Sequence, residues 1–88
     1  MEPAVLLAEL RALADNVPDF SSFASSSRAH HEWLGKVTAL IEQWNPSRSH
    51  VVSINMGYVG LSLARDGAVS TILGILHHAF VTLGSPNS

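Results

Sequence analysis

Charged side chains are confined almost entirely to the first half of this 88-residue chain. All but two of its Asp, Glu, Lys and Arg residues lie between Glu2 and Arg48, whereas the stretch from Ser49 to Ser88 contains only Arg65 and Asp66. Globular domains carry about a quarter charged residues on average, and a helix face in contact with water is usually rich in them. We therefore expect part of the second half to be covered by a protein neighbour.

The length of the chain indicates a single domain spanning residues 1–88. A chain of this size buries only about two-thirds of the surface that its unfolded form exposes, so its stability margin is small. It contains no cysteine, which excludes disulfide bonds, thiolate metal sites and a thiol nucleophile. Association with a partner is the stabilising route that remains. Residues 84–88 are expected to form a flexible tail or the start of a linker.

The composition also limits the compartment and the class of partner. The apolar content of 47% is too high for a disordered chain. A net charge of −2, with basic residues scattered singly, predicts no nucleic-acid binding. The N-terminus has two glutamates and no Lys or Arg before Arg11, which is the opposite of a signal peptide. We expect a cytoplasmic protein whose partner is itself or a larger protein.

The first helix is expected from Pro3 to about Asp15. Proline at the first helical position loses no needed N–H, and Glu2 lies at the positive end of the helix dipole. The helix should end before Pro18, because the residue that precedes a proline is disfavoured in the helical region. Apolar residues at steps of three and four predict a stripe that faces the core: Leu6, Leu10, Leu13 and Val17.

A second helix is expected from about Arg28 to Trp44, where apolar and polar faces are most clearly separated. The serine-rich stretch before it, from Asp19 to Ser27, is expected to be a loop or a frayed first turn anchored by Phe20 and Phe23. The apolar face of this helix comprises Trp33, Val37, Leu40, Ile41 and Trp44.

The segment from Ser47 to Ala64 permits two interpretations. As a helix it carries two apolar ridges, the first formed by Val51, Ile54, Tyr58 and Leu61 and the second by Val52, Met56, Val59 and Leu63. As strands, apolar residues alternate along it and its glycines would mark bends. We favour a helix from about Pro46 to Met56 followed by a glycine-containing turn, with Asn45 as its N-cap.

The last helix is expected to begin after a cap at Asp66 and to end at Leu83, before Gly84. Its apolar face comprises Val69, Ile72, Leu73, Leu76, Phe80 and Leu83. The opposite face is polar but uncharged, so it is either solvated or covered by another chain. We assign the candidate interface to six residues of this helix: Ser70, Thr71, Gly74, His77, His78 and Val81.

The sequence motifs predict no catalytic, metal or cofactor site. The histidine pairs His30-His31 and His77-His78 are adjacent in sequence, and adjacent helical residues point about 100° apart, so they cannot chelate one ion together. No two histidines are four residues apart, as a helical zinc motif requires. The chain has no G-x-S-x-G elbow and no glycine-rich phosphate loop. A hydrolase with an unrecognised Ser/His site is kept as an alternative.

A small membrane-active helical hairpin is a further alternative, because two apolar segments lie on either side of Arg65-Asp66. A membrane-spanning helix needs about 20 predominantly apolar residues. The segment Val51–Ala64 is shorter than this and contains Asn55, and the segment Ala68–Leu83 carries the second histidine pair. No cluster of Lys or Arg flanks either segment. These features count against membrane insertion, and the hairpin is kept as an alternative function.

Together these elements predict an all-α fold, a small antiparallel bundle of about four helices, because short connections join neighbouring helices in opposite directions. Its expected function is protein–protein interaction or homo-oligomerisation through the uncharged surface of the last two helices. The residues expected at its centre are Leu6, Leu10, Leu13, Trp33, Val37, Leu40, Trp44, Leu73, Leu76 and Phe80.

Two stretches, HHEWLGKVTALIEQW and DGAVSTILGILHHAFVTL, resemble the short helical modules found at the N-termini of bacterial multidomain defence and signalling proteins, ahead of an effector domain. The resemblance covers about Arg28 to Leu83 and consists of a Trp-led amphipathic helix, a turn, and a final helix opened by Asp-Gly. It implies an adaptor or oligomerisation role, with no catalytic residues to transfer.

Overall fold

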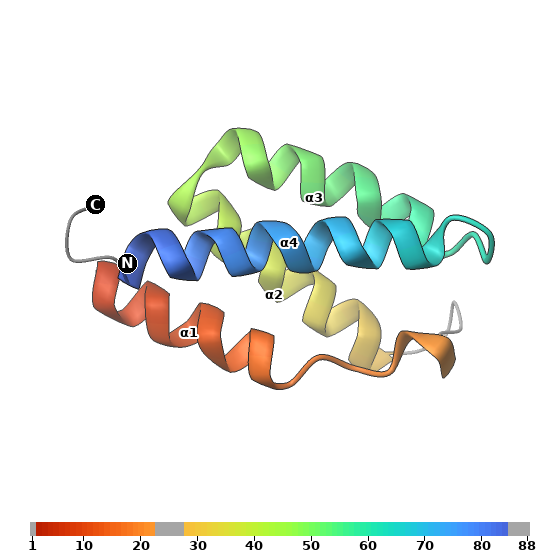
Figure 1. The fold of residues 1–88 in the computed structure, drawn as a ribbon, viewed down its shortest axis with the longest axis horizontal. Coiled ribbons are helices and arrows are strands. Elements are labelled where there is room, and N and C mark those ends of the chain that lie inside the picture. Colours follow the sequence, from red (N-terminus) through yellow and green to blue (C-terminus); the bar gives the residue numbers. More distant parts are fainter. Residues whose placement is uncertain (1, 23–27, 85–88) are drawn as a thin grey trace.

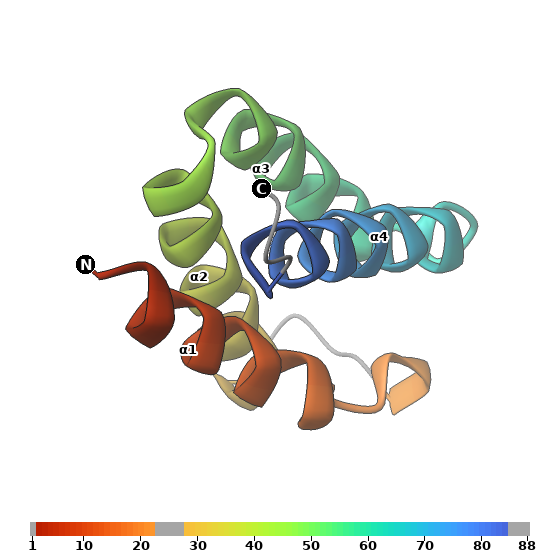
Figure 2. The same cartoon turned by 60° about the vertical axis from the view of Figure 1, so that its left-hand side comes forward.

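The structure, a computed structural model, describes residues 2–22 and 28–84 of the chain (Figures 1 and 2). It contains the helices α1 (Pro3–Asp15), α2 (Arg28–Trp44), α3 (Pro46–Val59) and α4 (Arg65–Gly84), and one turn of 3-10 helix, η1 (Phe20–Ser22). None of the residues in these two ranges is in a strand. The predicted all-α bundle is confirmed, and the strand interpretation of Ser47–Ala64 is wrong.

Helix α4 is the central element of the bundle and contacts all three other helices. In Figure 1, α3 lies along one side of α4, α1 lies along the other side, and α2 lies behind it. Figure 2 shows the same arrangement from the side, with α4 between α1 and α3. No described helix covers the remaining face of α4, which points towards the viewer in Figure 1.

The hydrophobic core draws on all four helices and η1. Its buried side chains are Leu6, Leu10, Phe20, Trp33, Leu34, Val37, Leu40, Ile41, Val52, Val59, Ala68, Ile72, Ile75, Leu76 and Ala79. Four residues expected at the centre, Leu13, Trp44, Leu73 and Phe80, are only half-buried at its edge. In α4 the least exposed side chains lie opposite its uncovered face, so the buried stripe includes Ile75 and Ala79, which the sequence analysis had not placed in the core.

Helix α1 begins at Pro3, as expected, and ends where Asn16 satisfies the last carbonyls of the helix. The Asn16 side-chain amide donates to the Ala12 carbonyl at 2.7 Å, and its backbone N–H donates to the Leu13 carbonyl at 3.3 Å. Val17 therefore lies beyond the helix and is 37% exposed. Its assignment to the core stripe was wrong, because the helical period does not continue past this cap.

The connection between α1 and α2 is fixed by the buried side chain of Phe20. Its ring packs edge-on against Trp33, with a centroid separation of 5.6 Å, and against His30 at 5.1 Å. The Trp33 indole N–H donates to the Leu13 carbonyl at 3.0 Å, which joins the end of α1 to α2. Phe20 is thus an anchor, as expected, whereas Phe23 lies outside the described residues.

Helix α3 begins at Pro46 and continues through Gly57 to Val59, three residues beyond the expected end at Met56. Gly57 has a negative φ, so nothing in its backbone interrupts the helix. Helix α4 begins at Arg65, and Asp66, which was expected to precede the helix as its cap, lies inside the first turn. Helix α4 ends at Gly84, one residue beyond the expected end at Leu83, so Gly84 belongs to the helix and not to the tail or linker expected over residues 84–88. The other residues of that expected tail, 85–88, lie outside the described residues.

The junction between α2 and α3 depends on a side-chain cap at Asn45, as the sequence predicts. The Asn45 Oδ1 atom accepts hydrogen bonds from the backbone N–H groups of Ser47 at 3.1 Å and Arg48 at 3.3 Å. Asn45→Ala is expected to lower the free energy of unfolding by about 1 kcal/mol, because both donors lose this acceptor. Asn45→Asp, which keeps an acceptor, should remain close to the wild type in urea unfolding. Equal losses in both variants would contradict the capping role.

Candidate association surface

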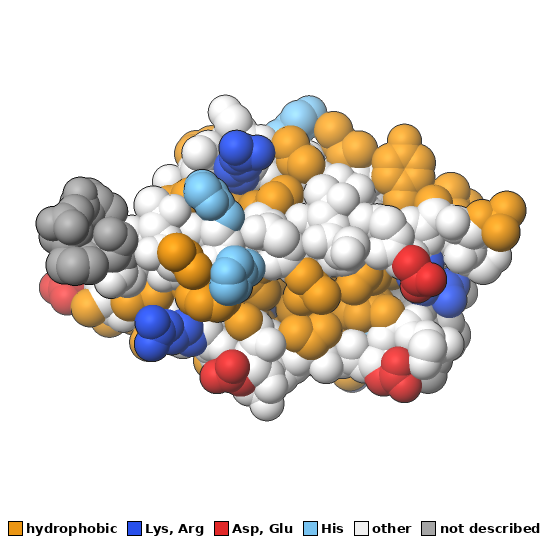
Figure 3. Space-filling view, in the orientation of Figure 1, with side chains coloured by type: hydrophobic (Ala, Val, Ile, Leu, Met, Phe, Trp, Pro, Cys, Tyr) orange, Lys and Arg blue, Asp and Glu red, His pale blue; other side chains and the backbone are white. Residues whose placement is uncertain are grey.

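The six candidate interface residues all lie on the uncovered face of α4. They recur at intervals of one, three and four residues, and every one of them is exposed: Ser70, Thr71, Gly74, His77, His78 and Val81. The side chains on the opposite side of the helix form part of the core. Figure 3 shows this face from the front, with charged side chains around its margin and none at its centre. The face is therefore exposed and uncharged within a single copy of the chain.

Both charged residues of the stretch from Ser49 to Ser88 are placed at the junction of α3 and α4. The Arg65 Nε atom donates to the carbonyl of Val59, the last residue of α3, at 2.8 Å. A cationic side chain is favourable there because the carbonyls at a helix C-terminus carry partial negative charge. Asp66 lies in the first turn of α4, where an acidic group is favourable for the opposite reason. The two charges thus stabilise the end of α3 and the start of α4. The rest of α4 carries no charged side chain.

The two histidines of α4 lie against different aromatic neighbours. The His78 ring packs edge-on against Trp44 of α2, with a centroid separation of 5.6 Å. The His77 ring packs against Phe80, at 4.9 Å, and the Arg11 guanidinium of α1 lies 5.9 Å from the centre of the same Phe80 ring. The two rings therefore face different sides of α4, one towards α2 and the other towards the side of α1. They are not arranged to bind one metal ion together.

A small hollow of about 240 Å³ adjoins the uncovered face of α4, where α2 ends and α3 begins. Its lining residues are Trp44, Arg48, Thr71, Gly74, Ile75 and His78. Three of the six candidate interface residues are among them, and Arg48 adds a fixed positive charge. We call this feature the Arg48 hollow. Arg48 was not among the residues expected in this surface, because only tertiary structure brings the first turn of α3 beside α4.

A second group of exposed side chains lies outside the six candidates, at the far end of α3 and in its connection to α4. Ile54 and Tyr58, one helical turn apart, are each 48% exposed, Leu61 is 56% exposed, and Leu63 is fully exposed. Figure 3 shows hydrophobic side chains beside this end of α4. Contiguous exposed apolar side chains of this kind often mark interaction sites. We call these four residues the α3 apolar patch.

The sequence shows that this segment has more apolar residues than one buried face needs, but it does not show which of them are exposed. The helix was expected to carry two apolar ridges, and nothing in the pattern decides which ridge faces the core. In the structure the ridge with Val52 and Val59 is buried, whereas Ile54 and Tyr58 point to solvent. Leu63 belongs to the ridge that is otherwise buried, and it is exposed because the helix ends before it.

A larger hollow, of about 660 Å³, lies between α1 and α2. Its floor includes Leu13, Trp33 and Leu40, and its rim carries Glu9, Glu32 and Lys36, along with several alanines and Pro18. The indole N–H of Trp33 is already bonded to Leu13, and the charges on the rim have both signs. The hollow therefore has no single chemical character that would select a ligand.

Within residues 2–22 and 28–84, no group of three or more His, Asp or Glu residues is placed to hold a metal ion. His30 is buried with its Nε2 atom 2.9 Å from the Asp19 carbonyl, so it belongs to the α1–α2 connection. The buried Ser49 hydroxyl donates to the Thr38 carbonyl at 3.1 Å, which ties α3 to α2. These polar groups have structural partners, and none of these contacts brings a serine to a histidine.

Asp19 has the one clear pKa shift among the described residues. The Ser21 hydroxyl and the Ser21 backbone N–H both donate to its carboxylate, at 2.6 and 3.0 Å. These hydrogen bonds favour the ionised form and hold the pKa of Asp19 below its ordinary value of 3.8. The group is fully exposed, and it supports the turn that carries Phe20 rather than a reactive centre.

By length and composition, α4 is the one described helix that is long and apolar enough to cross a membrane. A stretch of 18 residues in this helix has a mean hydropathy of 1.4, and 28% of that stretch is buried within the bundle. The helix has a buried side and an exposed side, and both are nearly free of charge.

Comparisons with protein-family models, curated proteins and solved structures found no match to this chain.

Proposed function

We propose that this protein is an association module, which binds itself or a larger protein through the uncharged face of α4 and the adjoining α3 apolar patch. The observation that carries this proposal is the exposure of that face in a single copy. Apart from Arg65 and Asp66 at the helix junction, no residue after Arg48 is charged, and four large apolar side chains stand in the solvent beside it. Burying such a surface costs little desolvation of charge and gains apolar contact.

The size of the chain supports the same proposal. A small domain without disulfides buries a modest core, and association adds buried area at little further cost in chain entropy. The resemblance noted in the sequence extends the proposal to an adaptor role in a bacterial defence or signalling system, in the cytoplasm. In that role the module would bring effector domains together without any chemistry of its own.

Sedimentation equilibrium of the 88-residue chain at micromolar concentration tests this proposal. We expect a dimer or higher oligomer that dissociates on dilution, because the surface is built from modest apolar contacts. A monomer at every concentration would eliminate self-association, and the proposal would then depend on a larger partner. Urea unfolding at two protein concentrations gives an independent measurement, since the unfolding midpoint of an associating protein rises with concentration.

A second candidate function is insertion into a membrane, and the apolar character of α4 favours it. Insertion would require α4 to leave its central place in the hydrophobic core. Leakage of dye from anionic and zwitterionic phospholipid vesicles measures this directly. Leakage at low protein concentration would favour the membrane candidate over association between proteins. Intact vesicles, together with an oligomer in solution, would exclude it.

A further inference from the structure

We propose that the partner on the uncharged face is a second copy of this chain, with the two α4 helices antiparallel about a two-fold axis near Ser70. In this arrangement Asp66 of each copy faces Arg48 in the hollow of the other copy. This inference rests on the proposed association function and names its partner.

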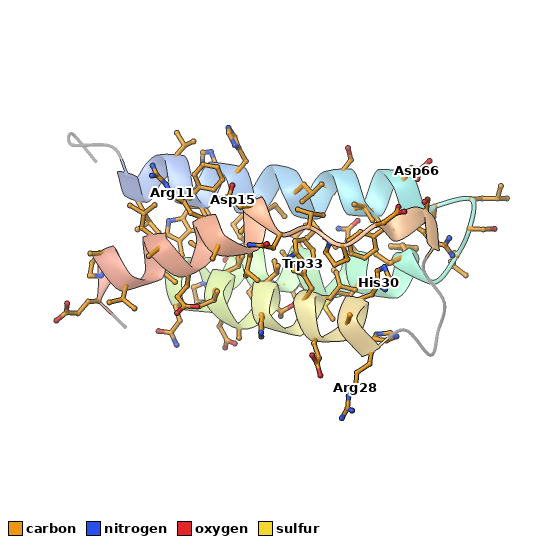
Figure 4. The ribbon with its side chains drawn as sticks, turned by 90° about the horizontal axis from the view of Figure 1, so that it is seen from below. Arg11, Asp15, Arg28, His30, Trp33 and Asp66 are labelled. Atoms are coloured by element: carbon orange, nitrogen blue, oxygen red, sulfur yellow. The ribbon has the colours of Figure 1, made fainter. Side chains whose placement is uncertain are left out.

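The acidic side chain of Asp66 and the Arg48 hollow lie at different levels along α4. Asp66, Ser70 and Gly74 are four residues apart and lie on the same exposed side of the helix. Figure 4 shows the Asp66 side chain at the start of α4, pointing away from the bundle. Gly74 lines the Arg48 hollow. With a rise of 1.5 Å per residue, the acidic group and the hollow therefore lie about 6 Å along the helix on either side of Ser70.

A two-fold axis exchanges these two positions. In a two-fold symmetric dimer, residue i of one copy contacts residue j of the other, and residue j contacts residue i. An axis through Ser70 brings the level of Asp66 in one copy to the level of Gly74 in the other. The carboxylate of one copy then meets the Arg48 hollow of the second copy, and the same contact forms twice.

Charge complementarity selects a second copy as the occupant. Asp66 is the only acidic residue after Glu42, and Arg48 supplies the cation of the hollow beside α4. Asp66 and Arg48 thus border the uncharged centre of the face with one charge of each sign, on opposite sides of Ser70. Such a face complements itself when reversed, whereas a parallel arrangement would set Asp66 against Asp66. Complementary charges of this kind fix the register of an interface.

The side chains at the centre of the face permit the close approach that this pairing needs. Ser70 and Gly74 are small, and a Cβ atom placed on Gly74 would meet nothing within 4 Å, so the space in front of the helix is open. The exchange about Ser70 also brings Gly67 of one copy close to the level of Gly74 of the other. Between Asp66 and Gly74 the exposed residues of α4 are Gly67, Ser70 and Thr71, none of which is charged or large.

Charge reversal in the full chain tests this arrangement. Asp66→Arg alone places a second cation against Arg48, and Arg48→Asp alone places a second carboxylate against Asp66. Each variant should therefore self-associate at least about tenfold more weakly than the wild type. An equimolar mixture of the two variants restores opposite charges at one of the two symmetry-related contacts and pairs the reversed charges with each other at the second. The mixture should form heterodimers more tightly than either variant forms homodimers, by at least about threefold in Kd, measured by sedimentation of one fluorescently labelled variant.

Matched controls separate this contact from a general effect of net charge. Glu42→Arg and Lys36→Glu make the same changes in the sign of a charge on the exposed face of α2, which lies behind α4 in Figure 1. Both should associate like the wild type. Helix content by circular dichroism checks the fold, and if Asp66→Arg unfolds the chain, Asp66→Asn provides the test, with an expected loss of about threefold.

The outcomes distinguish failure of self-association from failure of the antiparallel arrangement. A monomeric wild type would overturn both self-association and this arrangement. A wild type that dimerises, while the mixed variants fail to recover or the α2 controls weaken association equally, would overturn the antiparallel arrangement and leave the proposed function standing. Recovery in the mixture, with both single variants weakened, supports Asp66 and Arg48 as partners across the interface.

Discussion

Leu10→Ala is expected to lower the free energy of unfolding by about 2–5 kcal/mol. Leu10 is completely buried in α1, which packs against both α2 and α4. Removing its side chain loses apolar burial and leaves a cavity that the surrounding helices fill only in part. Since a domain of this size has a total stability of about 5–15 kcal/mol, this one change removes a large share of it. The melting temperature should fall by about 10 °C or more.

The matched control is Val5→Ala in the same helix. Val5 is 47% exposed, so its truncation should change the free energy of unfolding by less than about 0.5 kcal/mol. Thermal and urea unfolding of both variants, at a protein concentration where the wild type is monomeric, measure the fold without the contribution of association. Similar losses for the two variants would show that α1 is not packed in the orientation described.

Gly74→Glu is expected to weaken self-association at least about tenfold while leaving the fold intact. A Cβ atom at Gly74 meets nothing within 4 Å, so the substitution fits within a single chain. The loss of glycine from a helix interior should even raise the free energy of unfolding by about 0.5–1 kcal/mol. The new carboxylate, however, stands at the centre of the uncharged face. It occupies the Arg48 hollow and repels Asp66 of the second copy, which would otherwise enter there, so the Kd for self-association should rise at least about tenfold.

Gly35→Glu provides the control for this substitution. Gly35 lies on the exposed side of α2, and a Cβ atom there likewise meets nothing within 4 Å. It should give the same gain in helix stability and the same change in net charge, with unchanged association in sedimentation equilibrium. If Gly74→Glu associated as strongly as Gly35→Glu, the uncharged face of α4 would not be the contact surface.

Local features predicted from the sequence were reproduced where the signal came from neighbouring residues. The cap at Asn45, with Pro46 at the next position, defines the start of α3 because its hydrogen bonds are all within four residues. Helix α2 has the expected bounds, and most of its expected apolar face is buried, because its polar and apolar residues are clearly separated. The end of α1 was also correctly placed before Pro18.

The expectations that failed concerned the rotation of apolar helices. Helix α3 is apolar on two ridges, so its sequence does not say whether Val52 or Ile54 is buried, and only the position of α2 and α4 beside it decides this. In α4, apolar residues occur nearly all round the helix, and the core includes Ile75 and Ala79 while Leu73 and Phe80 lie at its edge. In both helices apolar residues are spread too evenly around the axis for the sequence to show which side faces the core.

The sequence by itself therefore determined that the chain forms helices, where they begin and end to within a few residues, and that its second half is almost free of charge. Tertiary structure alone decided which side of α3 and α4 remains open, and it placed Arg48 beside Thr71, Gly74 and His78. The physical reason is that hydrogen bonding and capping act over a few residues, whereas burial is settled by helices that are distant in the chain. The uncharged face follows from composition, but its position and its charged margin follow from packing.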